Sequence, residues 1–388
     1  MIKPAGQRLL ALDILRGITI AGMIMVNNPG SWRYVYAPLG HASWNGLTPT
    51  DLVFPFFMFI MGISTYISLR KYNFEFSNAA AWKIIKRTLV IFAIGLAIAW
   101  FGLFCRTWNS LSGEEISFWS RLGQSVWTFD RIRILGVMPR LALCYGATAL
   151  IALTVKHKNI PYLIATLLIG YLLILLFGNG FEYNDTNILS VVDRAVLGLN
   201  HMYKDNGIEP EGLLSTIPAI AHVLIGFCCG KLLMEVKDIN EKIQRLFLIG
   251  TILTFAGFLL DYGCPINKKI WSPSFAIVTC GLGSSFLALL IWIIDVKGYK
   301  KWSRFFEAFG INPLFIYVMA AVVSILLGSI RVPNGVDKMI SLKGYLYEII
   351  LQPALGDYPS SLAFALIFVT FCWLVGYILY KKKIYIKI

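Results

Sequence analysis

A histidine in a polar segment is the strongest candidate for acid–base chemistry in this sequence. His41 begins the run HASWNGLTPTD, which is rich in tryptophan, asparagine and glycine and lies between two long apolar stretches. Imidazole titrates near neutral pH, so a histidine in such a segment can act as a general base or as a nucleophile toward an acyl group. We therefore take His41 as the first candidate catalytic residue.

The acid at the end of the same run has two interpretations. Thr48, Pro49 and Asp51 have the spacing of a helix start, with a threonine N-cap, a proline at the first helical position and an acid three residues after the cap. Capping is the interpretation that we favour for Asp51. Contact with a substrate is the alternative.

Ionisable residues within apolar stretches are the next candidates, because a charge inside a membrane is costly and is usually functional. Asp13 and Arg16 are three residues apart, so one helical face can carry both and they can pair. They can clamp helices together or bind a charged ligand. Arg140 follows Pro139 at the start of another apolar stretch, and we expect it to have a partner or an anionic ligand.

The sequence lacks the patterns of several other kinds of site. It contains no Walker loop, dinucleotide-binding glycine run, serine nucleophile elbow or zinc-ligand spacing, and we expect no metal. Most of its seven cysteines lie within apolar stretches, where cysteine behaves as a small hydrophobic residue. Cys105 and Cys264 lie near the ends of two such stretches, so theirs is the one disulfide that we consider.

These candidates must be positioned by helices in a membrane, because the chain is too apolar for a water-soluble fold. Of its 388 residues, 57% are hydrophobic and only 14% are charged. We expect membrane spans at 9–27, 52–69, 84–104, 135–155, 160–178, 213–234, 246–262, 273–294, 305–328 and 361–380. The predicted fold is an all-α polytopic membrane protein, a bundle of about ten transmembrane helices that forms a single domain over residues 1–388.

The distribution of charge predicts the orientation of this bundle. The net charge is +14, but lysine and arginine gather in alternate loops. This pattern is typical of membrane orientation and not of a nucleic-acid surface, so we expect the lipid bilayer and no nucleic acid as a partner. It favours both termini in the cytoplasm. Three long segments, 28–50, 105–134 and 179–212, then lie outside, where we look for binding and chemistry.

Two outer segments carry weaker signals. The acids of the segment 182–211, among them Glu209 and Glu211, can attract a cationic amino sugar or form a solvated face. The stretch 339–356 is interrupted by charged residues and a proline, so we expect a surface helix there and not a span.

Several of these segments resemble those of one family along nearly the whole chain. The resemblance is carried by residues 12–17, 41–48, 51–55, 133–140, 193–198, 209–216, 267–272, 295–298 and the lysine-rich tail. They are similar to the heparan-α-glucosaminide N-acetyltransferases of lysosomes and their bacterial relatives, within a wider group of transmembrane acyltransferases. The runs beginning at His41 and Asn267 are the most specific.

The resemblance implies an acetyl-CoA-dependent N-acetyltransferase in a bacterial inner membrane. It would move acetyl from cytosolic acetyl-CoA to the amine of a glucosamine-type sugar or glycan on the periplasmic side. The family's active histidine falls on His41 and its nearby asparagine on Asn27. His41 would take the amine proton or pass through an acetyl-histidine, and Asn27 would orient it or donate to the developing oxyanion. Dimers occur in the family, so we also consider a homodimer.

The resemblance also implies where the two substrates bind. The residues expected near acetyl-CoA are Arg8, Asp13, Arg16, Arg140 and Lys382. Basic side chains at the inner face suit the phosphates of CoA. The residues expected near the acceptor are Asn45, Asp51, Asn267, Lys268 and Trp271.

Two alternatives use the same fold. One is a permease for glucosamine or N-acetylglucosamine, which sugar accumulation in vesicles without CoA chemistry would identify. The other is an acyltransferase for a cell-envelope glycan, which differs mainly in its acceptor. A scaffold without ligands is disfavoured, because buried charges such as Asp13 and Arg16 are costly to keep.

Overall fold

Long apolar runs of the sequence form long helices, because a helix satisfies its own backbone hydrogen bonds where water is absent. The computed structural model describes residues 9–335 and 338–386. Its helices are α1 (Leu10–Asn27), α2 (Val53–Leu69), α3 (Asn78–Ser110), α4 (Phe118–Val126), α5 (Val137–Thr154), α6 (Ile160–Phe177), α7 (Ile188–Leu197), α8 (Thr216–Glu235), α9 (Ile239–Asp261), α10 (Pro273–Ile291), α11 (Arg304–Ile311), α12 (Pro313–Ser329), α13 (Leu342–Gly344), α14 (Gln352–Leu355) and α15 (Asp357–Lys381). The strands are β1 (Arg331–Pro333) and β2 (Met339–Ser341).

The helices confirm the predicted fold class. Within the described residues, nine helical segments are long and apolar enough to cross a membrane, and α11 with α12 adds a tenth only when the two are taken together. The protein is therefore an all-α polytopic membrane protein. The orientation with both termini in the cytoplasm stays a prediction.

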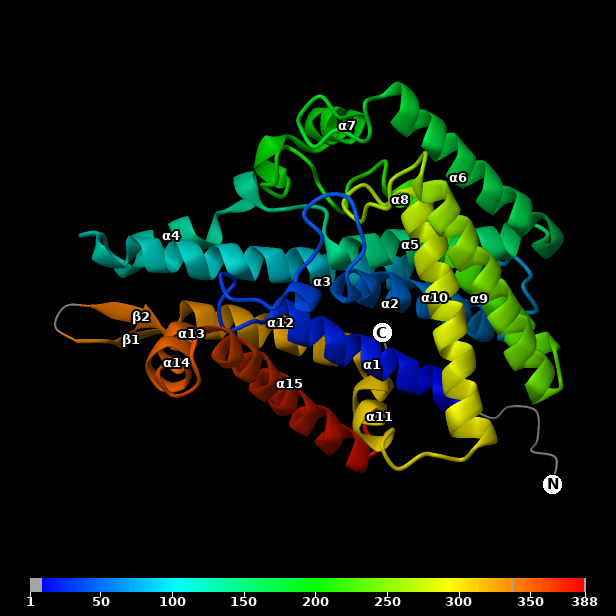
Figure 1. Ribbon diagram of the computed structural model, residues 1–388. Coiled ribbons are helices and arrows are strands. Elements are labelled where there is room, and N and C mark those ends of the chain that lie inside the picture. The colour runs from blue at the N-terminus through cyan, green and yellow to red at the C-terminus, as the bar shows by residue number, and fades with distance from the viewer. Residues whose placement is uncertain (1–8, 336–337, 387–388) are drawn as a thin grey trace.

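The spans form an inner and an outer group (Figure 1). In α1, α2, α5, α8 and α10, 61–67% of the apolar window is buried, whereas in α3, α6, α9 and α15 only 17–33% is buried. The outer helices therefore present most of their apolar surface to lipid. The inner helices α1 and α5 hold Asp13, Arg16 and Arg140, and Asp51 lies just before α2.

The span predicted at 305–328 is broken into two helices, α11 and α12. The chain turns by 86° between α11 and α12. Pro313 has no backbone N–H and disfavours a helical conformation at the preceding residue. Accordingly, Asn312 has φ −123° and ψ 54°, outside the helical region.

Glycines let α11 pack directly on the backbone of α1. A Cβ atom at Gly310 would lie 2.1 Å from the carbonyl oxygen of Asp13, and one at Gly17 would lie 1.9 Å from the carbonyl oxygen of Phe306. No side chain fits at either position without moving one helix. This contact fixes α11 against the half of α1 that carries Asp13 and Arg16.

Replacing Gly310 with alanine should lower the thermal stability of the purified protein by about 1–3 kcal/mol, the usual cost of overpacking a core. Gly328→Ala on α12 is the matched control, because a Cβ atom there meets nothing within 4 Å. It should leave the protein as stable as the wild type or more stable, because alanine favours a helix. Thermal unfolding in detergent measures both, and equal melting of the two variants would contradict the packing argument.

The stretch 339–356 is helical only in part. Its first three residues form β2, which pairs antiparallel with β1 through Ile340 and Val332. Helical structure begins at Leu342, where the Ser341 side chain accepts a hydrogen bond from the backbone N–H of Gly344. The predicted surface helix is therefore wrong at its start, because a strand partner upstream was not recognised.

Several connecting segments meet at one end of the bundle, which we call the His41 end. They are the segments 28–48, 111–136, 178–215 and 262–272. The N–H of Gly46 donates to the carbonyl of Ile266 at 2.8 Å, and the N–H of Ile134 donates to the carbonyl of His201 at 3.1 Å. Residues far apart in sequence are thus held together at this end.

Candidate active site

The start of α2 positions a buried carboxylate. The Asp51 side chain accepts hydrogen bonds from the backbone N–H of Thr48 at 3.2 Å and from its hydroxyl at 2.9 Å, and only 1% of Asp51 is exposed. The capping interpretation is therefore confirmed. The same Oδ2 atom accepts a third hydrogen bond, at 3.1 Å, from the N–H of Ala42. Asp51 thus ties the segment that begins at His41 to the helix.

The other oxygen of Asp51 binds the candidate base. Asp51 Oδ1 lies 2.6 Å from Nδ1 of His41. An ionised carboxylate can only accept, so Nδ1 is the donor in this pair. The His41 side chain is 42% exposed, and Nζ of Lys268 lies 3.5 Å from its Nε2 atom. Capping and orientation of the histidine are therefore two functions of one carboxylate.

A lysine from the loop before α10 joins this pair. Nζ of Lys268 lies 3.1 Å from Nδ1 of His41 and 3.5 Å from Oδ1 of Asp51. Burial lowers the pKa of the Lys268 ammonium, while the carboxylates of Asp51 and Glu211 oppose that shift. The sequence singled out each of these residues, but only the fold shows that Lys268 and His41 touch.

Two asparagines lock the loops that carry His41 and Lys268. The side-chain amide of Asn267 donates to the side-chain oxygen of Asn45 at 3.0 Å, and its own oxygen accepts from the N–H of Ile270 at 3.2 Å. Asn267 is completely buried. Its amide group therefore holds the loop, whereas Asn45 is exposed.

Behind this surface lies a buried pair of large side chains. Only 1% of Trp271 is exposed, and the guanidinium carbon of Arg140 lies 5.2 Å from the centre of its ring. Arg140 is fully buried and donates to the carbonyl of Gly212 at 3.1 Å and to the hydroxyl of Ser215. The partner expected for Arg140 is therefore the segment that leads into α8, together with an aromatic face.

Asp193 on α7 is a buried acid to which the sequence assigned no function. It is fully buried, and its Oδ1 accepts a hydrogen bond from the N–H of Leu213 at 2.8 Å. Burial raises the pKa of its carboxyl from 3.8 to about 6; Glu209 adds to this, while the Leu213 hydrogen bond and Arg140 oppose it. In the sequence, only the position of Asp193 within an amphipathic helix could have identified it as a buried residue.

The raised pKa of Asp193 predicts a pH dependence of stability. The folded protein holds this proton more tightly than the unfolded chain, so its stabilising contribution is complete below about pH 4 and is lost as the pH rises through about 6. Asp193→Asn keeps an acceptor for Leu213 but has no proton to lose. As the pH rises through this window, the free energy of unfolding of the wild type should therefore fall by up to about 3 kcal/mol more than that of the variant. Melting temperatures measured from pH 4 to 7 test this, and parallel curves would refute it.

A buried ion cluster joins the segment before α5 to the segment before α8. Nε of Arg133 donates to Oε2 of Glu209 at 3.0 Å, and its NH2 group contacts Oε2 of Glu211 at 2.5 Å. Glu209 is completely buried. The alternative of a solvated acidic face is therefore wrong for Glu209, because its partner comes from a segment 76 residues away.

The remaining predicted residues lie elsewhere. Arg8 is outside the described residues. Asn27 is exposed at the C-terminal end of α1, and its side chain makes no hydrogen bond to the described part of the chain. Arg16 binds Asp13 at 2.9 Å and Ser64 on α2 at 2.8 Å, which is the arrangement of an interhelical clamp.

The residues predicted to bind the acetyl donor thus fall into two groups. Asp13 is 14 residues from the end of α1, or about 21 Å from the His41 end at 1.5 Å per residue. Lys382 is exposed just beyond the end of α15. Arg140, in contrast, lies at the start of α5 and therefore at the His41 end.

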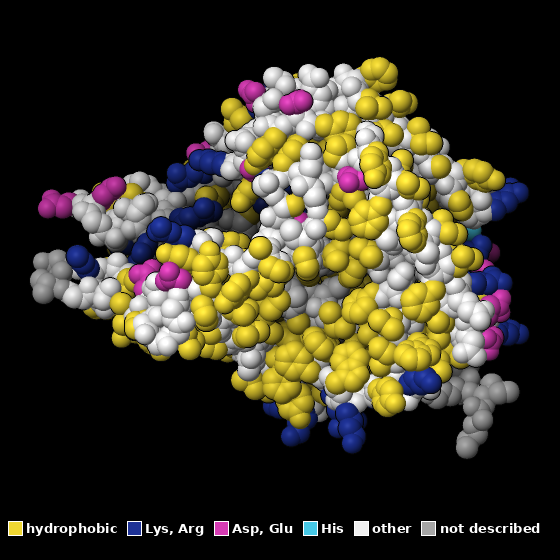
Figure 2. Space-filling model, in the orientation of Figure 1, with side chains coloured by type: hydrophobic (Ala, Val, Ile, Leu, Met, Phe, Trp, Pro, Cys, Tyr) yellow, Lys and Arg dark blue, Asp and Glu magenta, His cyan; other side chains and the backbone are white. Residues whose placement is uncertain are grey.

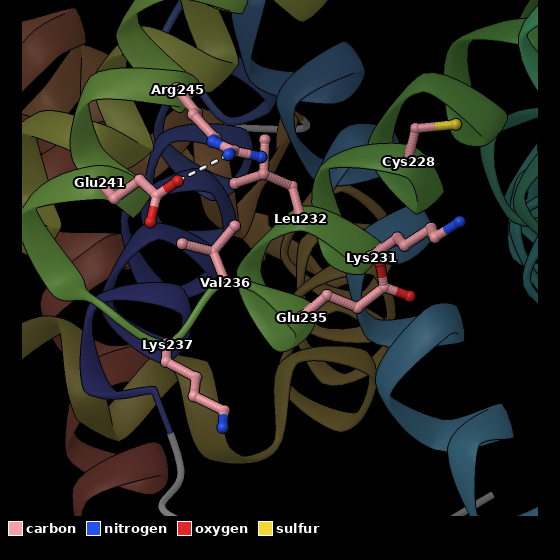
Figure 3. A pocket seen from close by; sticks show the side chains of 8 residues that line it. All are labelled: Cys228, Lys231, Leu232, Glu235, Val236, Lys237, Glu241 and Arg245. Atoms are coloured by element: carbon pink, nitrogen blue, oxygen red, sulfur yellow. Dashed lines mark hydrogen bonds and ion pairs between the residues drawn. The ribbon is translucent and has the colours of Figure 1, made fainter.

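A cavity of about 490 Å³ opens where α8 ends and α9 begins (Figure 3). Lys231, Lys237 and Arg245 line it together with Glu235 and Glu241, and Arg245 binds Glu241 at 2.6 Å. α8 has 20 residues, so the cavity is about 30 Å from the segment that binds Arg140. It is therefore separate from the His41 site.

The described residues contain no group of three or more histidines, cysteines or acids that could hold a metal ion. All seven cysteines are free thiols, so Cys105 and Cys264 are not paired.

Comparison with known proteins gives a consistent result. The family model described as heparan-alpha-glucosaminide N-acetyltransferase, catalytic, matches residues 8–262, which include His41 and Asp51 but end before Lys268. The heparan-alpha-glucosaminide N-acetyltransferase of Mus musculus is 28% identical over an alignment that covers 100% of this chain and 61% of the mouse protein. The protein of the same name from Homo sapiens is 28% identical, with 100% of this chain and 62% of the human protein covered.

The chain therefore spans about three fifths of the length of the curated relatives that it matches. The family match covers well over half of its residues and contains the histidine–carboxylate pair. This protein belongs to the heparan-alpha-glucosaminide N-acetyltransferase family.

Proposed function

We propose that this protein transfers acetyl from acetyl-CoA to the amine of a glucosamine-type sugar. The observation that carries the proposal is the His41–Asp51 pair, in which the carboxylate lies 2.6 Å from Nδ1 of an imidazole whose side chain is 42% exposed. A protonated amine is not a nucleophile, so N-acetylation requires a base that works near neutral pH. An oriented imidazole meets that need, and the curated relatives are N-acetyltransferases by name.

In the proposed reaction His41 acts as the general base. Nε2 takes a proton from the sugar amine as the nitrogen attacks the thioester carbonyl carbon. The new C–N bond forms, the C–S bond breaks, and the proton passes from His41 to the departing CoA sulfur. Asp51 stabilises the imidazolium that forms in between, as the acid of a catalytic triad does.

Positive charge and amide groups supply the rest of the site. Nζ of Lys268, 3.1 Å from His41, supports a role in stabilising the oxyanion of the tetrahedral intermediate. Asn27 remains our candidate for a second oxyanion donor, since its side chain is exposed and unengaged. Asn45, together with the loop that holds Asn267 and Trp271, is proposed to contact the acceptor.

We place the donor's phosphates at the other end of the bundle, which the charge bias assigns to the cytoplasm. Gly310 accepts a hydrogen bond from Arg16 at 3.3 Å, and two residues later Asn312 donates to the carbonyl of Ile384 at 2.8 Å. Arg16 and the segment that follows Lys382 therefore meet at the turn between α11 and α12. Arg16 and Lys382 are our candidate cations for the anionic head of CoA, with the acetyl arm reaching toward His41.

In this orientation His41 faces the periplasm of a bacterial inner membrane, where the acceptor is an amino sugar or an amino-sugar-containing glycan. A homodimer is part of the proposal by analogy with the family. A permease for amino sugars is the alternative function, but it gives no reason for a histidine–carboxylate pair beside a lysine.

The test is mass-spectrometric detection of N-acetylglucosamine made from glucosamine and acetyl-CoA by the purified protein in detergent. Product that depends on protein and acetyl-CoA is expected. If no product forms and sealed vesicles accumulate glucosamine without acetyl-CoA, the protein is a permease and not an acetyltransferase.

A further inference from the structure

A cleft at the His41 end has no place in the reaction described so far. It has a volume of about 780 Å³, within the range of small-molecule sites, and lies between α3, α12 and the start of α5. Figure 2 shows lysine and arginine side chains beside a hollow on the left of the view, where Figure 1 has α3 above and α12 below. Apolar side chains line one part of the cleft and cationic side chains line another.

One lining is apolar and lies along the helices. Ile98, Ala99 and Leu103 form one face of α3, and Tyr317 and Ala321 form the facing side of α12. Only 17% of the apolar window of α3 is buried, so the helix that forms this wall presents most of its apolar surface to lipid. A hydrocarbon chain can therefore reach the cleft sideways from the bilayer.

The other lining is cationic and lies at the mouth of the cleft. It consists of Arg106, Arg131 and Lys204, with Asp130 as the one unpaired acid beside them and Arg133 already bound to its two glutamates. In the described part of the chain, none of the first three forms an ion pair with a carboxylate. Three cations beside a single acid, above an apolar slot, fit a phosphate attached to a hydrocarbon chain.

The cleft is also connected to the candidate base. Arg133 lines the cleft and contacts Glu211 at 2.5 Å. Burial raises the pKa of the Glu211 carboxyl, but the charges of Arg133, Arg140 and Lys268 outweigh burial and lower the pKa. Lys268 in turn lies 3.1 Å from His41. Arg133 thus belongs both to the cleft and to the ion cluster with Glu211, at the same end of the bundle as His41.

We propose that the acceptor is an amino sugar linked through phosphate to a long hydrocarbon chain, and that the chain occupies the cleft between α3 and α12. The proposal rests on the proposed acetyl transfer and specifies its acceptor. The phosphate binds Arg106, Arg131 and Lys204, and the sugar extends from it toward His41. Delivery from the bilayer explains why an apolar slot leads to a polar catalytic end.

The first experiment compares two acceptors, glucosamine linked to farnesyl phosphate and free glucosamine, with Ala99→Trp as the variant that fills the slot. Ala97→Trp is the matched control, because Ala97 is on the same helix but exposed to lipid. Ala99→Trp should raise KM for the lipid-linked sugar at least about tenfold and leave free glucosamine unchanged, while Ala97→Trp changes neither. Equal effects on both acceptors, or equal use of both by the wild type, would overturn the proposal.

The second experiment measures binding without acetyl-CoA and so separates the two proposals. Native mass spectrometry should detect the farnesyl-linked sugar on the wild type and on Ala97→Trp, and weaker binding to Ala99→Trp and to the double variant Arg131→Gln/Lys204→Gln. If no acceptor is acetylated but this pattern holds, the acetyl transfer fails and the cleft assignment stands. Equal binding of phosphatidylglycerol in competition would mark a general lipid site and overturn the assignment.

Discussion

His41→Ala should reduce acetyl transfer by about 10²–10⁴-fold, the usual contribution of a general base. The variant removes the group that takes the amine proton but leaves Asp51 bonded to Thr48, Ala42 and Lys268. Helicity and melting temperature should therefore remain close to those of the wild type. The measurement is the rate of N-acetylglucosamine formation by purified protein, with unfolding followed in the same sample.

The matched control for this variant is His201→Ala. His201 also lies at the His41 end, but its Nδ1 atom contacts the carbonyl of Ile132 at 2.8 Å and no carboxylate. It should retain most of the activity. Full activity of His41→Ala would exclude the proposed mechanism, and equal losses in both variants would indicate a general disturbance of the loops.

Arg133→Ala should destabilise the protein by about 3–5 kcal/mol, because it leaves a buried charge without its partner. Glu209 is completely buried and receives two hydrogen bonds from the Arg133 guanidinium. Burial raises the pKa of Glu209 and Arg133 opposes that shift, so the ionised carboxylate depends on the arginine. Thermal unfolding in detergent at neutral pH is the measurement.

Two further variants give this prediction its controls. Arg131→Ala removes a neighbouring exposed arginine that donates only to Thr107, at 3.1 Å, and should change stability by less than about 0.5 kcal/mol. The double variant Arg133→Ala/Glu209→Gln should recover part of the loss, because no buried charge remains. Equal melting of Arg133→Ala and Arg131→Ala would show that the cluster does not hold the two segments together.

The membrane spans were predictable because their signal is local. An apolar run long enough to cross a bilayer must form a helix wherever it lies in the chain. The turn between α11 and α12 was harder to predict, although Pro313 marks its position. A proline can kink or end a helix, and the close approach of Gly310 to α1 selects the sharp turn.

The residues of the candidate site could be predicted from the sequence, but their arrangement in space could not. The sequence by itself determined that His41 lies in a polar segment before a capped helix, and that Asp51 is placed to cap it. It also determined the charge pairing of Asp13 with Arg16, since both lie on one turn of a helix.

Only the tertiary structure decided that Asp51 also orients His41, that Lys268 joins them, and that Arg133 neutralises Glu209. These contacts join residues 10, 227 and 76 positions apart. Hydropathy and capping depend on neighbours within a few turns of helix, whereas a contact between distant loops depends on how the whole bundle packs. The physical reason is that helix formation is a local property of the chain, while the meeting of charged side chains depends on which helix ends the packed bundle brings together.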